Sequence, residues 1–304
     1  MKNERPHISV IIPTLNRCST LPRALHSVLK QSVLPYEIIV VDNGSTDATA
    51  QIMRRHYSKI RFLSERKVGV SAARNLGIRA SKGNWIALLD SDDEWLANKL
   101  ERQIEELTNC PKSIRLVHTN EIWKKNNVFM SQMVKHKKTG GSIFKECLRM
   151  CCISPSSSMI RKDVFSDIGY FDEKLPACED YDLWLRICAK EDVLFIDEDL
   201  IVKHGGHNDQ LSRKYWAMDR FRVYALENLL ETGELCLENQ NASYKMLVKR
   251  LDVLIQGGEN RGNKSLVDFY RRKKNYWITV MKSSKKTIKK TDIRIKEIPR
   301  HYFE

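Results

Sequence analysis

Short apolar runs alternate with helix-like segments over residues 8–89, and this alternation limits the possible folds more than any other feature. The expected strands are 8–12, 37–41, 61–63 and 85–89, and the expected helices begin near Thr20, near Thr46 and at Ser71. Strands that alternate with helices favour parallel pairing. The sequence therefore predicts an α/β fold whose mostly parallel sheet is flanked by helices.

Polar segments follow three of these strands directly. They are 13–17, 42–47 and 90–93. In open α/β sheets, ligands bind at the carboxyl ends of the strands. We expect the three segments to converge there and to form a binding cleft.

The segment Asp90-Ser91-Asp92 carries two carboxylates on alternate residues at a strand end. Such a pair suits one hard divalent cation, Mn²⁺ or Mg²⁺, together with the ribose or diphosphate of a ligand. Aspartate is also common in turns, and Asp93 is equally suited to capping the segment that follows. The position after an apolar strand favours the metal interpretation.

Five segments, in order, resemble the motifs of family 2 glycosyltransferases, which have the GT-A fold. They are Ser9 to Arg17, Val40 to Asp47, Gly69 to Gly77, Leu88 to Asp93 and Cys178 to Arg186. The resemblance covers about residues 7–210. Two positions depart from it, since Asn43 replaces a frequent Asp and Cys178 replaces a frequent Gly. Cys178 makes the backbone there less permissive than Gly would.

The resemblance implies a role for each matching residue. The nucleoside would be bound by Pro13, Thr14, Asn16, Arg17 and Asp42, in a pocket lined by Arg74. Asp90 with the adjacent Ser91 would contact the ribose, and Asp92 would bind the metal. Asp180, beside Glu179, would be the catalytic base. The implied donor is a nucleotide-sugar, with UDP favoured. The implied acceptor is a hydroxyl of a glycan or glycolipid, in cell-surface polysaccharide synthesis.

Physical chemistry supports these roles. A cation at Asp92 neutralises the charge that develops on the leaving diphosphate, and one carboxylate opposite it permits direct displacement with inversion. Retention lacks a distinctive signal. A nucleotidyltransferase of similar fold would show a Gly-rich phosphate loop after the first strand, and segment 13–16 is not one. A non-catalytic nucleotide- or sugar-binding protein is the other alternative, and the intact Asp92 and Asp180 argue against it.

A glycine-containing loop follows the expected strand 199–203 and carries His204 and His207. Loops at this point of GT-A enzymes close over the donor, so either histidine is a candidate metal ligand. The competing interpretation is a pair of exposed histidines. Three structural interpretations also stand beside the functional ones: Asp47 as a turn or helix-cap residue, Arg186 as the i, i+4 partner of Asp182, and Trp184 as core.

The expected organisation is a catalytic domain over 1–212, a helical region over 213–281 and a basic tail over 282–304. Helices are expected at 219–230 and 244–255, with Gly233 and Gly257-Gly258 as stops. The net charge is +14, and residues 271–296 carry eleven Lys or Arg and one acid. Charge outside the catalytic motifs is typical of a solvated tail or of a tail that contacts anionic membrane, and nucleic-acid binding is not expected.

The compartment expected from the sequence is the cytoplasm, with peripheral contact at the inner face of the membrane. No apolar run reaches the length of a membrane-spanning helix, and no signal segment precedes the first strand. The eight cysteines show no CxxC pair and no zinc-ligand spacing, which is typical of reduced thiols.

Overall fold

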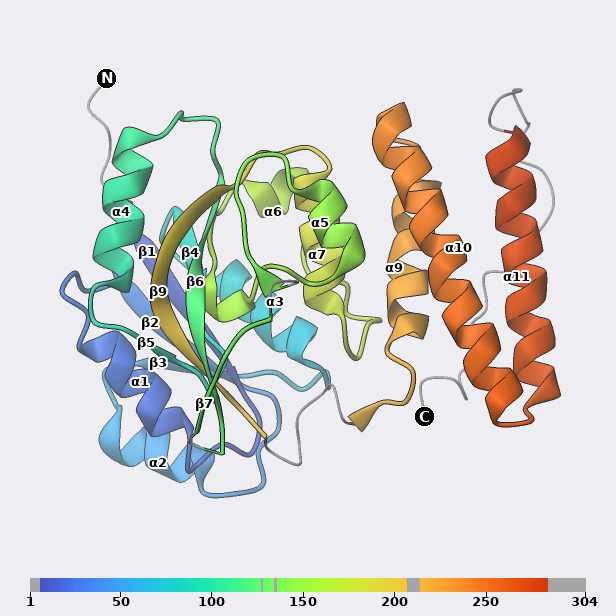
Figure 1. Ribbon diagram of the computed structural model, residues 1–304. Coiled ribbons are helices and arrows are strands. Elements are labelled where there is room, and N and C mark those ends of the chain that lie inside the picture. The colour runs from blue at the N-terminus through green and yellow to red at the C-terminus, as the bar shows by residue number, and fades with distance from the viewer. Residues whose placement is uncertain (1–5, 127, 134–135, 207–213, 284–304) are drawn as a thin grey trace.

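The computed structural model describes residues 6–126, 128–133, 136–206 and 214–283. Within these residues the strands form one nine-stranded sheet in the order β3-β2-β1-β4-β8-β6-β9-β5, with β7 paired to β6. Figure 1 shows helices on both faces of this sheet and a separate group of helices beside it. The strands are β1 Ile8–Thr14, β2 Glu37–Asp42, β3 Arg61–Ser64, β4 Trp85–Leu88, β5 Glu94–Trp95, β6 Leu116–Lys125, β7 Val128–Met130, β8 Met159–Arg161 and β9 Leu194–Gly205. The helices are α1 Leu21–Leu29, α2 Thr49–His56, α3 Val70–Ala80, α4 Lys99–Asn109, α5 Phe144–Arg149, the 3₁₀ turn η2 Pro155–Ser157, α6 Val164–Asp167, α7 Glu179–Cys188, α9 Asp219–Glu231, α10 Leu237–Asn260 and α11 Lys264–Ser283.

The first four strands pair in parallel, as the sequence predicts. β1 lies between β2 and β4, and β2 pairs with β3. All seven residues of β1 are buried, because helices cover both faces of the sheet at this strand. The predicted α/β fold class is therefore confirmed.

The other half of the sheet is mixed. β8 pairs antiparallel with β4 and β6, whereas β6 and β9 run parallel. The short strand β5 lies at the edge and pairs antiparallel with β9, so the turn before it is held against that strand. β9 thereby brings residues near 200 to the acidic turn at residues 90–93.

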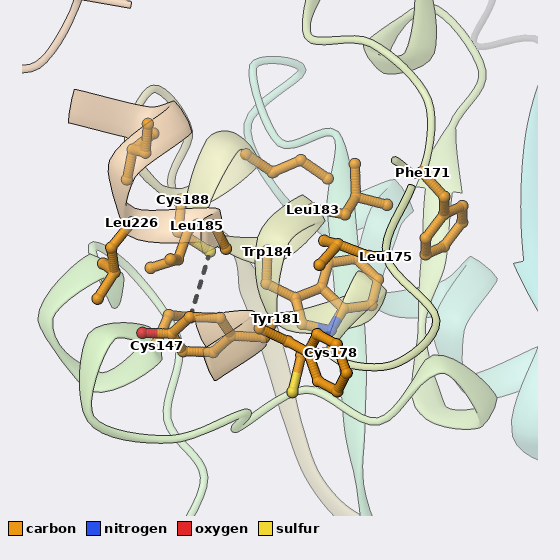
Figure 2. Close-up of a cluster of buried hydrophobic side chains, with 14 of the residues drawn as sticks. Cys147, Phe171, Leu175, Cys178, Tyr181, Leu183, Trp184, Leu185, Cys188 and Leu226 are labelled. Carbon is orange, nitrogen blue, oxygen red and sulfur yellow. Dashed lines mark hydrogen bonds between the residues drawn. The ribbon is translucent and has the colours of Figure 1, made fainter. Parts of the chain in front are cut away.

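Two hydrophobic cores lie on opposite faces of the sheet. Val10 and Ile12 of β1 belong to the core under α1, whereas Ile11 belongs to the core under α3 and α7. This division follows from the two-residue period of a strand. Figure 2 shows part of the second core, where Trp184 and Tyr181 of α7 pack among leucines and cysteines. The side chain of Trp184 is fully buried, which confirms its interpretation as core.

The last three described helices pack together beside α5 and α7 (Figure 1). The expected stop at Gly257-Gly258 is wrong, because α10 continues to Asn260. A Cβ added at Gly258 would lie 2.8 Å from Val267 Cγ2 of α11, so the glycine allows two helices to approach closely. It is a packing residue and not a terminator.

The basic segment 271–296 is only partly a tail. α11 includes Arg271, Arg272, Lys273, Lys274 and Lys282, and it buries Tyr270 and Trp277. The Lys273 ammonium pairs with Glu227 of α9 inside the helical group. Residues 284–304 lie outside the described residues. No described helix is long and apolar enough to cross a membrane.

Candidate functional site

The loops after β1 and β2 start side by side. The parallel register places Thr14 opposite Asp42, and the Thr14 carbonyl accepts a hydrogen bond of 2.9 Å from the Asn43 N–H. Pro13 is buried one residue earlier in β1. The strand ends therefore bring together the two segments to which the family resemblance assigns nucleoside binding.

Asn16 fastens these loops to each other. Its Oδ1 accepts hydrogen bonds from the backbone N–H of Thr46 and of Asp47, and its own N–H donates to Ser45 Oγ at 2.8 Å. Asn16 has a φ of 53°, a left-handed conformation that Asn tolerates better than most residues. The next residue, Arg17, is half-buried, and its N–H donates to Thr49 Oγ1 at 3.0 Å.

Asp42 and Asp47 differ in their surroundings. Asp42 is 7% exposed, and its Oδ1 accepts from the N–H and hydroxyl of Ser45 at 3.1 and 2.5 Å. Asp47 accepts from the backbone N–H groups of Thr49 and Cys18, at the start of α2. Burial alone would raise the pKa of Asp47, but hydrogen bonds from Thr49 and Cys18 lower this pKa to about 2. Asp47 is therefore a structural residue of this turn, whereas the N-cap of α2 is Ala48.

Arg74 of α3 joins two groups of carboxylates. Its Nη1 lies 2.6 Å from Glu179 Oε1 at the start of α7, and its Nη2 lies 2.7 Å from Asp90 Oδ1 after β4. The side chains of Arg74 and Glu179 are 3% and 6% exposed, and that of Asp90 is 29% exposed. A guanidinium buried between two carboxylates fixes both of them in direction. The first acidic motif and the downstream acidic motif therefore belong to one site.

The acidic turn after β4 rests on the 3₁₀ turn η2. The backbone N–H of Asp90 donates to Ser156 Oγ at 3.1 Å, and the Ser156 hydroxyl donates to Asp93 Oδ2 at 2.6 Å. Ser91 is buried beside them and Asp92 is half-buried. Burial, and then the neighbouring charge of Asp92, raise the pKa of Asp93 well above its ordinary value. Asp93 is therefore a buried support of the turn and not a simple helix cap.

Lys203 of β9 supplies positive charge beneath this turn. Its Nζ lies 3.2 Å from Ser154 Oγ. Burial opposes its charge, but Glu121, Asp93 and Asp90 together raise the pKa of Lys203 above its ordinary value. The lysine therefore offsets part of the repulsion among carboxylates that are close in space.

His204 lies at the same turn. Its backbone N–H donates to Asp93 Oδ1 at 3.1 Å, and its Nε2 lies 3.7 Å from Glu94 Oε2. Burial, and then the nearby Arg23 cation, lower the pKa of the imidazole, which favours the neutral form that metals bind. The second candidate, His207, lies outside the described residues.

The donor set at this turn suits a hard divalent cation. Asp92 would supply carboxylate oxygens, and His204, whose backbone N–H donates to Asp93, would supply a neutral imidazole from the adjacent strand. Within residues 6–126, 128–133, 136–206 and 214–283, no group of three or more His, Cys, Asp or Glu is arranged as a metal site. A cation bound here would therefore depend on oxygens of its ligand for much of its coordination.

Asp180 occupies the first turn of α7. Its Oδ2 accepts a hydrogen bond of 3.2 Å from the Cys151 thiol, and its Oδ1 accepts one of 2.7 Å from the backbone N–H of Tyr181. Unlike Glu179, Asp180 forms no ion pair with Arg74, and it is only half-buried. Burial and the neighbouring Asp180 charge raise the pKa of Glu179 to about 7 despite Arg74. The two adjacent carboxyl groups thus have different environments.

Cys178 has a φ of 62°, in the left-handed region where glycine is favoured. The expectation that its side chain constrains this turn therefore has a structural basis. Further along α7, the guanidinium of Arg186 pairs with Asp182 at 2.7 Å, which confirms the i, i+4 interpretation.

Four residues near the site carry no sequence signal that identifies them. Ser156 and Cys151 come from an irregular segment, Lys203 is one residue of a strand, and Arg23 of α1 donates to the Asp92 carbonyl. Each is brought to the site by a contact distant in sequence.

The sheet and this convergence of loops define a GT-A glycosyltransferase. The model of the family described as "Glycosyl transferase family 2" matches residues 9–169, and the chain belongs to that family. It is 31% identical to the UDP-Glc:alpha-D-GlcNAc-diphosphoundecaprenol beta-1,3-glucosyltransferase WfgD of Escherichia coli, over 62% of this chain and 73% of that protein. It is 29% identical to an uncharacterized glycosyltransferase of Rickettsia bellii over 82% of this chain, and it spans only 37% of that relative's length.

A solved structure shows the same fold. The structure of S. aureus TarS 1–349 in complex with UDP-GlcNAc matches with a TM-score of 0.63 and 21% identity, over 80% of this chain and 71% of that one. The comparison supports the GT-A architecture of the sheet and its helices.

Proposed function

We propose that this chain is a metal-dependent, inverting glycosyltransferase that moves a sugar from a UDP-sugar to a hydroxyl of a glycan or glycolipid acceptor, in cell-surface polysaccharide synthesis. The observation that carries the proposal is the Arg74 bridge. It connects Asp90, on the side assigned to the donor, with Glu179, the neighbour of the assigned base. This bridge supports the proposal, because it holds a residue assigned to the donor and the neighbour of the assigned base in one hydrogen-bonded group.

In this proposal the loops after β1 and β2 bind the nucleoside. Pro13, Thr14, Asn16 and Arg17 shape the first loop, and the Asp42 carboxylate accepts a hydrogen bond from the nucleobase. Asn16 is largely engaged in fastening the two loops, so its contribution is shape. Asp90 and Ser91 face the ribose, and Arg74 orients Asp90. The choice of a UDP-sugar as donor is supported by the relative named as a UDP-Glc glucosyltransferase and by the TarS complex with UDP-GlcNAc.

Asp92 and His204 would bind Mn²⁺ or Mg²⁺, with His207 as a further candidate. The cation supplies Lewis acidity that neutralises the leaving diphosphate. Asp180 accepts the proton of the acceptor hydroxyl while that oxygen bonds to the anomeric carbon. The bond from that carbon to the diphosphate oxygen breaks, UDP leaves with its electron pair, and the configuration inverts. Glu179 remains paired to Arg74 beside the base.

We also propose the three-part organisation, with a catalytic part over 1–212, helices over 213–281 and a basic segment from 282. Action in the cytoplasm at the inner membrane face fits this charge distribution. Removal of residues 282–304 would reduce binding to vesicles rich in anionic lipid at low salt and leave turnover of a soluble acceptor nearly unchanged. Equal vesicle binding by the truncated chain would contradict the membrane role.

The metal assignment is tested by Asp92→Ala, with Asp252→Ala on the surface of α10 as the matched control. Wild type and control should gain stability from UDP only when Mn²⁺ is present, by about 3 kcal/mol at a ligand concentration one hundred times Kd. Asp92→Ala should lose this gain and keep its melting temperature without ligand. Metal-dependent UDP stabilisation that survives in Asp92→Ala would contradict the assignment, and stabilisation by GDP or CDP alone would contradict the choice of UDP.

A further inference from the structure

A buried cation at the start of α9 has no partner in the described part of the chain. Arg220 is 3% exposed, and its Nε, Nη1 and Nη2 are all buried without a hydrogen bond to any described residue. The guanidinium lies 4.5 Å from the ring centre of Trp216 and 4.6 Å from that of Phe221. Two aromatic faces attract its charge, but they satisfy none of its five N–H donors.

Neighbouring arginines make the contrast clear. Arg222 and Arg250 both pair with the Asp219 carboxylate, at 2.8 and 3.1 Å. Burial lowers the pKa of the Arg220 guanidinium, and only the tyrosines 215 and 270 act in the opposite direction. Charged groups that are buried in proteins are normally paired and hydrogen-bonded. An anion would supply the hydrogen bonds and the opposite charge that Arg220 lacks among the described residues.

This part of α9 borders the carboxylates of α7. The Cys178 thiol donates to the Met218 carbonyl at 3.9 Å, and the Arg222 guanidinium lies 6.0 Å from the Tyr181 ring centre. Cys178 and Tyr181 flank Glu179 and Asp180 in sequence. Figure 1 shows α9 between α7 and α10. The start of α9 therefore contacts the turn that carries Glu179 and Asp180, and an anion at Arg220 would bind next to this contact.

We propose that Arg220 binds a phosphate group of the acceptor, with Trp216 as an aromatic wall of that subsite. The inference rests on the proposed function, because it names the chemical class of its acceptor. Three free nitrogens in a planar fork match the several oxygens of a phosphate, whereas a carboxylate engages two donors. Trp216 is 40% exposed, so the cation lies close beneath the surface.

The test measures binding of inorganic phosphate by calorimetry, with UDP and Mg²⁺ at saturation and chloride used to keep ionic strength constant. UDP binding is measured first, so failure of the donor site is seen separately. Wild type should bind phosphate and bind acetate more weakly. Arg220→Met, which keeps an apolar stem against both rings, should weaken phosphate binding at least about 10-fold, the scale of a hydrogen-bonded charge.

Two controls separate the subsite from structure and from general charge. Arg271→Met removes an exposed arginine of α11 and should bind phosphate as wild type does. Arg220→Lys keeps the positive charge without the planar guanidinium and should bind phosphate with intermediate affinity. This variant provides the test if Arg220→Met does not fold. Absence of phosphate binding in wild type, or equal binding by the Arg220 variants, would overturn the proposal and assign Arg220 to aromatic packing. If acetate binds as tightly as phosphate, the proposal of a phosphate ligand is wrong and the ligand class is a carboxylate.

Discussion

Arg74 and Glu179 form a buried ion pair, 2.6 Å from Nη1 to Oε1, yet the pKa of Glu179 is raised to about 7. Burial and the adjacent Asp180 favour the neutral carboxyl, and Arg74 only partly opposes them. The carboxyl therefore changes its protonation near neutral pH. Its effect on stability can be worked out from the direction of the shift.

The free energy of unfolding should depend on pH through Glu179. Because its folded pKa lies above the ordinary value near 4.3, the folded state retains a proton that the unfolded state has released. The stabilisation is complete below about pH 4.3 and is lost as pH rises to about 7, with a slope of at most about 1.4 kcal/mol per pH unit. Urea unfolding of Glu179→Gln should lack this slope. The free energy of unfolding of the variant should therefore increase relative to that of wild type as the pH rises from about 4.3 to about 7.

Glu173→Gln is the matched control, because hydrogen bonds from Asn75 and Lys67 lower the pKa of Glu173. Its contribution has the opposite sign: it is present above the ordinary pKa and is lost as pH falls. A Glu179→Gln profile parallel to that of wild type between pH 4.5 and 7 would contradict the raised pKa.

The Cys151 thiol should orient the proposed base. It donates to Asp180 Oδ2 at 3.2 Å, and removal of one ordinary hydrogen bond changes a rate by about 2- to 10-fold. Cys151→Ala should lower kcat by that factor, and Cys151→Ser should restore it, because a hydroxyl also donates. Cys152→Ala is the control, since the Cys152 sulfur contacts Cys147. A Cys151→Ala enzyme with wild-type kcat would show that the thiol is only packing.

Lys99 should destabilise the fold at neutral pH. Its side chain is fully buried in the core, it contacts the Trp95 ring at 4.1 Å and Gln103 Oε1 at 2.8 Å, and burial lowers its pKa well below the ordinary value. The unfolded chain therefore binds a proton that the folded chain does not, and stability rises with pH up to about 10.4. Lys99→Met should remove that rise. Urea unfolding at pH 7, 8 and 9 would reveal it, and equal slopes in the two proteins would contradict the prediction.

The sequence predicts the parallel half of the fold well, because each buried strand is marked by an apolar run and each following loop by polar residues. Thr14 and Asp42 were expected at one edge, and the register places them opposite each other. The roles assigned to the site residues stay predictions. The supports of the acidic turn were not predictable: Ser156 and Lys203 reach it through antiparallel and edge pairings that leave no periodic signal. The prediction that Gly258 ends a helix was wrong for a similar reason, because glycine serves both close helix packing and helix termination.

Asp180→Asn should separate catalysis from donor binding. The substitution keeps the size of the side chain but cannot take the acceptor proton, and general-base catalysis contributes about 10² to 10⁴ in rate. Turnover should fall on that scale, whereas UDP affinity should be unchanged, because the proposed donor contacts come from Asp42, Asp90 and Asp92. Glu179→Gln, adjacent in sequence, is the comparison: a dead Glu179→Gln and an active Asp180→Asn would exchange the two roles. The stereochemistry is checked independently by NMR of the product, where an α-linked donor should give a β-linked product. An α-linked product would mean retention and would exclude single displacement, whichever carboxylate proves essential.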